Sequence, residues 1–191
     1  MDHAIPVQKN KPLLSNGVLA MILFIAVEVM YFLALISAYL IISRGSVVWP
    51  PPEQPRLPIP VTSLNTVVLL LSGFMMFLSN KAYLRNNKSG ALSKLTISVV
   101  LATVFLGIQG YEWSLLIYEG LTFFSSNYGS LFYLIVGSHA LHAVVAIIIM
   151  FWVWFKMKRG TVSDSAFNTA QTFWYFVVGV WPFLYITVYL L

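Results

Sequence analysis

The sequence predicts an all-α polytopic membrane protein, folded as a bundle of five transmembrane helices. Of its 191 residues, 59% are hydrophobic and only 9% are charged. Soluble domains are about 45–50% apolar and about 25% charged, and a soluble domain of this size could not bury so much apolar surface. Five segments are also long and apolar enough to cross a bilayer, which takes roughly 20 residues each. A soluble enzyme, a disordered chain and a secreted disulfide scaffold are therefore excluded.

The expected helices follow one another with short connections. Their approximate bounds are Gly17–Ser43, Val61–Ser79, Leu95–Tyr118, Ser130–Phe155 and Thr169–Leu191. The first apolar run is too long for the core of a signal peptide and has no clear cleavage site after it, so we expect it to remain as a helix. The chain thus divides into a polar N-terminal tail over residues 1–16 and a five-helix transmembrane domain over residues 17–191.

Each helix has its own boundary signals. The first starts at Ser15-Asn16-Gly17, where Ser15 is the expected N-cap, and it stops before a proline-rich loop. The second and fourth helices stop at segments rich in Lys and Arg, and the last helix contains Pro182. Small residues such as Gly107 and Gly110 are expected where helices touch, because membrane helices associate through close packing.

The orientation in the membrane follows from the basic residues. One side of the expected bundle carries Lys9, Lys11, Lys81, Arg85, Lys88, Lys94, Lys156, Lys158 and Arg159, and the other carries only Arg44 and Arg56. Short loops on the cytoplasmic side are enriched in Lys and Arg, so the N-terminus is expected inside and the C-terminus outside. These scattered cations form no coherent patch for nucleic acid, and none is expected as a partner.

Few polar side chains lie inside the spans, and each needs an explanation because charge at bilayer depth is costly. The carboxylates are Glu28 and Glu112. Glu28 is expected about 17 Å from the inner end of its helix, close to the middle of the membrane. It is interpreted as a proton-responsive or lipid-contacting carboxyl. The alternative is a protonated side chain that hydrogen-bonds a neighbouring helix.

His139 and His142 are three residues apart and share one helix face. A structural metal site needs about four ligands, the chain has no cysteine, and two histidines on one face cannot ligate opposite faces of a haem. We therefore expect structural, hydrogen-bonded histidines in a polar network with Gln109 and Glu112, and no catalytic, cofactor-binding or metal-binding residue. Similar depths predict a hydrogen bond between Glu112 and His139.

Several short runs carry a further signal through their order and spacing. They are Phe24-Ile25-Ala26-Val27-Glu28-Val29-Met30-Tyr31-Phe32, Trp49-Pro50-Pro51, Leu64-Asn65-Thr66, Leu69-Leu70-Leu71-Ser72-Gly73, Gln109-Gly110-Tyr111-Glu112-Trp113, Tyr128-Gly129-Ser130 and Gly137-Ser138-His139-Ala140-Leu141-His142. Together they resemble subunit III of the haem–copper oxidases, the family of cytochrome c and quinol oxidases. The resemblance extends from Leu19 to Tyr185 and fits the family's shorter, five-helix form.

The resemblance implies a role and a set of partners. The family's counterpart of Glu28 is a carboxyl that reacts with carbodiimide, and the cleft around it holds phospholipids. Subunit III itself carries no haem or copper, so these are expected in partner subunits. The resemblance also implies packing against oxidase subunit I, contacts with other oxidase subunits, support of proton uptake, and protection from inactivation during turnover.

The last helix departs from the family pattern. The family reads Trp-His-Phe-Val-Asp, whereas this chain reads Trp174-Tyr175-Phe176-Val177-Val178. Tyr175 replaces the histidine and Val178 replaces the aspartate. Their joint loss indicates that a polar contact was replaced as a unit, since either group alone would be left unpaired.

Four functional hypotheses remain open. The first is a non-catalytic subunit III of a bacterial respiratory terminal oxidase, which reduces oxygen to water and pumps protons in the cytoplasmic membrane, alone or in a larger supercomplex. The second is an accessory subunit of a nitric oxide reductase or a quinol oxidase. The third is a small transporter or channel, and the fourth is a haem b carrier that uses His139 and His142.

Overall fold

The computed structural model describes residues 15–52 and 54–191, and it confirms the all-α, five-helix prediction. The elements are α1 (Asn16–Gly45), α2 (Ile59–Leu84), α3 (Lys88–Tyr118), α4 (Asn127–Lys158), α5 (Asp164–Tyr185) and a terminal π-helix, η1 (Ile186–Leu190). Five helices in this part of the chain are long and apolar enough to cross a membrane. Of the predicted tail, residues 1–14 lie outside the described residues, and Asn16 already belongs to α1.

Side-chain caps fix the starts of four helices. Ser15 Oγ accepts a hydrogen bond from the Val18 N–H at 3.4 Å, as its sequence position predicts. Asn87, Ser126 and Ser163 cap α3, α4 and α5 in the same way. A cap satisfies one of the N–H groups that a helix start leaves unpaired. These caps lie in the polar loops, before the apolar runs begin. Most of the helices are therefore longer than the apolar runs from which they were predicted.

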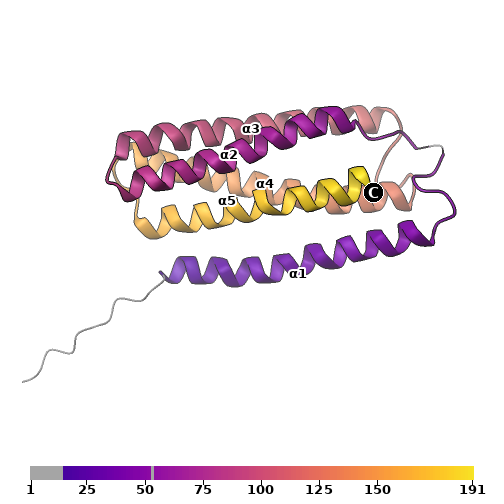
Figure 1. The fold of residues 1–191 in the computed structure, drawn as a ribbon, viewed down its shortest axis with the longest axis horizontal. Coiled ribbons are helices and arrows are strands. Elements are labelled where there is room, and N and C mark those ends of the chain that lie inside the picture. Colours follow the sequence, from indigo (N-terminus) through magenta and orange to yellow (C-terminus); the bar gives the residue numbers. More distant parts are fainter. Residues whose placement is uncertain (1–14, 53) are drawn as a thin grey trace, which may run out of the picture.

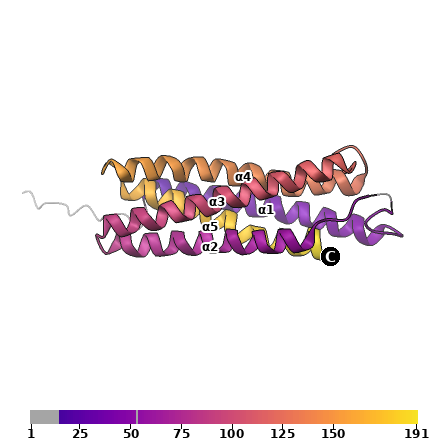
Figure 2. The same cartoon turned by 90° about the horizontal axis from the view of Figure 1, so that it is seen from above.

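The helices are not equally embedded in the bundle. α5 contacts α1, α2 and α4, while α3 lies between α2 and α4. In Figure 1, α1 runs along one side of the group formed by the other helices, and in the view of Figure 2 it passes behind them. Only 6% of the residues in the most apolar window of α1 are buried, against 56% for α5. α1 is therefore a peripheral helix with a broad apolar face free of contacts within this chain.

The bundle has two chemically different ends. The short turns at residues 85–87 and 159–163 form the basic end, where Lys81, Arg85, Lys88, Lys94, Lys156, Lys158 and Arg159 are placed. The loop segments at residues 46–52, 54–58 and 119–126 and the end of η1 form the far end (Figure 1), which carries Arg44 and Arg56.

Glycine packing differs in part from the sequence prediction. A Cβ added at Gly107 or Gly110 would meet nothing within 4 Å, so the predicted helix contacts at these residues are wrong. Close approach occurs instead at Gly73 in α2, where an added Cβ would lie 2.9 Å from Val178 Cγ1 in α5. The small-residue rule is sound for membrane helices, but the sequence does not show which face of a helix meets a neighbour.

Candidate functional site

A carboxylate and an imidazole face each other between α1 and α4. The Oε2 atom of Glu28 lies 3.0 Å from Nε2 of His142, and their side chains are 18% and 14% exposed. Glu28 is twelve positions into α1, which places it about 18 Å from the helix start. The structure thus places Glu28 near the middle of its helix, as predicted, and pairs it with a histidine that the sequence did not match to it. We call Glu28 and His142 the mid-membrane pair.

The other nitrogen of His142 decides how many protons the pair holds. Its Nδ1 atom lies 2.7 Å from the carbonyl oxygen of Ser138. A carbonyl only accepts hydrogen bonds, so Nδ1 carries a hydrogen. The contact between Nε2 and Glu28 then contains one proton, either on the carboxyl or on the imidazole. The pair has no net charge in either state, which lowers the cost of keeping it inside a membrane.

Aromatic rings surround the imidazole of His142. Ring centroids of Phe32, Phe176 and Phe173 lie 5.5, 6.2 and 6.4 Å from that of the imidazole. The edge-on geometry of these contacts is typical of favourable aromatic packing. Low local polarity strengthens the electrostatic interaction within the pair, and the packed rings restrict the paths by which water reaches it.

A second polar cluster, the far-end network, is buried between α2, α3 and η1. Glu112 accepts a hydrogen bond from Thr62 Oγ1 at 3.1 Å and another from Gln109 Nε2 at 3.1 Å. The same Gln109 nitrogen donates to the hydroxyl of Tyr189 at 3.2 Å. All four residues are buried. The predicted network around Gln109 and Glu112 therefore includes two members, Thr62 and Tyr189, that sequence reasoning missed.

The predicted hydrogen bond between Glu112 and His139 is absent. Within the described residues, Glu112 binds Thr62 and Gln109 instead. Similar depth puts the two side chains at the same level of the bundle, but it does not show whether their helices are rotated so that the side chains face each other. His139 and the far-end network are thus separate.

His139 is almost fully buried and lies among aromatic rings. Its ring centroid is 5.1 Å from that of Trp181 and 6.3 Å from that of Phe32. Its Nε2 atom has no hydrogen-bond partner among the described residues. The expectation of two hydrogen-bonded histidines therefore holds for His142 and not for this nitrogen of His139.

Nothing in the sequence singles out Thr62 or Tyr189 as members of the network. Thr62 is one of several hydroxyl residues near the start of α2. Tyr189 is in η1, whose five residues follow Pro182 within the last span, and its side chain is buried. A π-helix places its side chains at angles that an α-helical repeat does not predict, and such segments often occur at functional sites.

Comparison with known proteins identifies the family to which this five-helix chain belongs. The family described as cytochrome c oxidase subunit III matches residues 3–191. The chain belongs to this family. Subunit III of Pyricularia grisea is 33% identical over 98% of the chain and 70% of its own length. Subunit III of Synechocystis sp. is 33% identical over 89% of the chain and 73% of its own length. Subunit III of Patiria pectinifera is 34% identical over 98% of the chain and 72% of its own length.

Membership in the family shows which complex the chain is part of. It is a subunit III of the cytochrome c oxidase complex, a multi-pass protein of a respiratory membrane, and other oxidase subunits are its partners. Of the four hypotheses from the sequence, the comparison supports the first at the level of the oxidase subunit.

The donor groups of this subunit III do not form a haem or copper site among the described residues. No group of three or more His, Cys, Asp or Glu side chains lies close enough to hold a metal ion in residues 15–52 and 54–191. His142 uses both ring nitrogens for Ser138 and Glu28. The aromatic surroundings of His139 supply no second ligand. These residues do not fit the metal groups of the complex.

The two departures in α5 lie in different environments. Tyr175 lines an apolar groove between α1 and α5, and its hydroxyl has no partner among the described residues. Val178 is buried and packs against Gly73 of α2. The structure therefore shows two apolar contacts with different helices at these positions.

Proposed function

We propose that this chain is the non-catalytic subunit III of a bacterial haem–copper oxidase that reduces oxygen to water, and that it supports proton uptake by subunit I. The observation that carries the proposal is the contact of Glu28 with His142 at 3.0 Å, with Nδ1 of the imidazole fixed by the Ser138 carbonyl. Haem and copper in partner subunits supply the oxygen chemistry. This chain supplies a proton-holding site and a packing surface.

The mid-membrane pair is suited to hold and exchange a proton. One proton is shared between two groups that are within hydrogen-bond distance, so moving it from the carboxyl to the imidazole requires no rearrangement of either helix. Both side chains retain partial exposure, which leaves a route for exchange with an adjacent subunit or with water.

The outer face of α1 supports a contact with subunit I or with phospholipid. Large apolar side chains are exposed along the whole helix, including Leu19, Leu23, Val27, Met30 and Ile41. Membrane helices with such faces are covered either by lipid or by another helix. Since Glu28 is on the same helix, a subunit bound to α1 would lie close to the pair.

The basic end supports an orientation with the N-terminus in the cytoplasm. The positive-inside rule counts Lys and Arg in short loops, and the turns at residues 85–87 and 159–163 are short and lie near a cluster of cations. We propose the bacterial cytoplasmic membrane as the location, with the far end on the periplasmic side.

The test is to purify the complex through a tag on this chain and to compare the wild type with Glu28→Gln. We expect haem-containing and copper-containing partners, oxygen uptake, and a several-fold lower turnover in the variant with an unchanged subunit composition. Glu119→Gln is the matched control, because this carboxyl is exposed at the far end, and it should behave as wild type.

Other outcomes would contradict specific parts of the proposal. A purified complex that consumes no oxygen would contradict the proposed support of oxygen reduction. A complete oxidase with wild-type turnover in Glu28→Gln would overturn the proton role while leaving the subunit assignment in place.

A further inference from the structure

The far-end network contains a buried carboxyl group that the proposed function does not use. Glu112 is 3% exposed, and Thr62 beside it is 0% exposed. The Oγ1 atom of Thr62 lies 3.3 Å from Oε1 and 3.1 Å from Oε2 of Glu112. The same Oγ1 atom lies 3.0 Å from the carbonyl oxygen of Pro58. Thr62 therefore faces two acceptors, and one of them is a group that can gain a proton.

The hydroxyl of Thr62 can satisfy both charge states of Glu112. A threonine hydroxyl donates one hydrogen and also accepts. When Glu112 is a carboxylate, Thr62 donates to it in a charge-assisted hydrogen bond. When Glu112 carries a proton, its O–H becomes a donor, and Thr62 accepts from it while donating to the Pro58 carbonyl. The change needs only a rotation of the hydroxyl hydrogen, because all the oxygen atoms are already within hydrogen-bond distance.

Gln109 cannot change its role in this way. Its Nε2 atom donates to Oε2 of Glu112 at 3.1 Å and to the hydroxyl of Tyr189 at 3.2 Å. An amide nitrogen has two hydrogens and does not accept, so it faces Oε2 as a donor in both states. A proton on Glu112 is then best placed on Oε1, the oxygen that faces Thr62. Thr62 is thus the partner that adapts to the proton.

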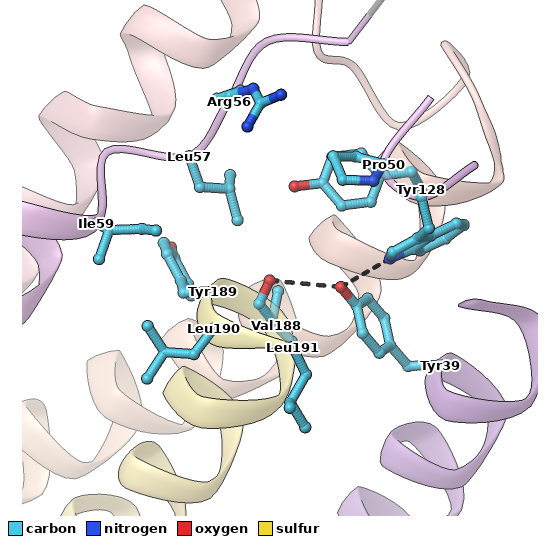
Figure 3. A pocket seen from close by; sticks show the side chains of 11 residues that line it. Tyr39, Pro50, Arg56, Leu57, Ile59, Tyr128, Val188, Tyr189, Leu190 and Leu191 are labelled. Atoms are coloured by element: carbon cyan, nitrogen blue, oxygen red, sulfur yellow. Dashed lines mark hydrogen bonds between the residues drawn. The ribbon is translucent and has the colours of Figure 1, made fainter. Parts of the chain in front are cut away.

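Two pockets at the far end border the network. Glu112 lines a pocket of about 150 Å³. Tyr189 lines a larger pocket of about 250 Å³, and Figure 3 shows its side chain below the segment that carries Arg56 and Leu57. Gln109 joins the Tyr189 hydroxyl to Glu112. Water in either pocket would come close to the network.

The described residues around Glu112 include few other titratable groups. Arg56, Tyr111 and Glu119 line the smaller pocket with it. Arg56 and Glu119 carry opposite charges. Tyr189 faces the network from η1, and α2 contributes the uncharged Thr62.

We propose that Glu112 takes up and releases a proton at the far end of the bundle, and that Thr62 is the positioning residue for both of its charge states. The proton comes from water in the adjoining pocket and returns to it, so an O–H bond is the only bond that forms or breaks. The site is separate from the mid-membrane pair, because α2, α3 and η1 form it, whereas α1 and α4 hold Glu28 and His142.

The proposal can be tested by infrared difference spectroscopy of the full chain in a fixed detergent during a pH titration. A protonated carboxyl group has a C=O stretching band that a carboxylate lacks. We expect such a band to appear and disappear reversibly in the wild type, to be retained in Glu28→Gln and to be lost in Glu112→Gln. A titration without any band that depends on Glu112 would overturn the proposal.

Three threonine variants test the positioning role. Thr62→Val keeps the shape and removes the hydroxyl, so the midpoint of the Glu112 band should shift by about one pH unit or more, which is a tenfold change in proton affinity. Thr62→Ser keeps the hydroxyl and should stay within about 0.5 unit of the wild type. Thr103→Val is the matched control in α3, because Thr103 donates to the carbonyl of Val99 in its own helix, and its titration should be that of the wild type.

Two further results would overturn the proposal. One is a wild-type midpoint in Thr62→Val, and the other is an equal shift in Thr62→Val and Thr62→Ser, which would show an effect of packing. If Glu112→Gln does not fold, a band that shifts in Thr62→Val and returns in Thr62→Ser still identifies Glu112, because Thr62 hydrogen-bonds this carboxyl group.

Discussion

Nε2 of His142 lies 3.0 Å from Oε2 of Glu28, and the two residues are 114 positions apart in the chain. This contact joins α4, which is well packed in the bundle, to α1, which is largely exposed. The only other side-chain hydrogen bond between these two helices in the described residues is that of Tyr31 with Ser138, at 2.8 Å. The mid-membrane pair is therefore an attachment point for a peripheral helix, in addition to the proton-holding role that we propose for it.

Replacing His142 with Phe should destabilise the chain by about 1–3 kcal/mol, because Glu28 would lose its hydrogen-bond partner in a poorly solvated place. Glu28→Gln should cost less, since the amide N–H can donate to the free lone pair of His142 Nε2. Unfolding of the purified chain, followed by helical circular dichroism in a fixed detergent, measures both values. Equal destabilisation by the two variants would mean that the pair contributes nothing beyond packing.

The far-end network should behave as a coupled unit. Gln109→Leu removes the donor to both Glu112 and Tyr189, so we expect a loss of about 2 kcal/mol in unfolding free energy. Tyr189→Phe removes one acceptor and should cost less. In the double variant the two losses should not add, because residues in one hydrogen-bond network share their interaction energy. Strict additivity in this double-mutant cycle would contradict the network.

Glu112 and His139 should instead be energetically independent. Each has its own neighbours, with hydrogen bonds around Glu112 and aromatic rings around His139. The losses from Glu112→Gln and His139→Phe are expected to add within about 0.5 kcal/mol. A larger coupling, measured by the same unfolding assay, would revive the direct contact that the sequence predicted.

The sequence predicts the helices well and their mutual rotation poorly. Composition and apolar runs are properties of a segment, and they were sufficient to give all five spans, the cap at Ser15 and the unusual position of Glu28. Partner choice depends on which faces of two helices meet. In a membrane helix this is hard to infer, because lipid-facing and protein-facing residues are both apolar.

The polar residues illustrate the same limit. The sequence selects Glu28, Gln109, Glu112, His139 and His142 because such groups are rare at this depth. It pairs Glu112 with His139 from depth alone, whereas the structure pairs Glu28 with His142 and connects Glu112 to Tyr189 through Gln109. The sequence does not draw attention to Tyr189, because tyrosine is common near the ends of spans. The π-helix also changes the direction in which the Tyr189 side chain leaves the helix.

The close approach of α2 and α5 gives the last prediction. A Cβ at Gly73 would lie 2.9 Å from Val178 Cγ1, so Gly73→Ala should destabilise the bundle by about 1–3 kcal/mol through overpacking. The partner atom belongs to a side chain that can be shortened, and the double variant Gly73→Ala with Val178→Ala should therefore recover much of the loss. Gly107→Ala is the control, since nothing lies within 4 Å of its added Cβ and stability should not fall. If Gly73→Ala and Gly107→Ala have the same unfolding free energy, α2 and α5 are not in tight contact at Gly73. Packing against Gly73 would then not explain why the residue at position 178 is apolar.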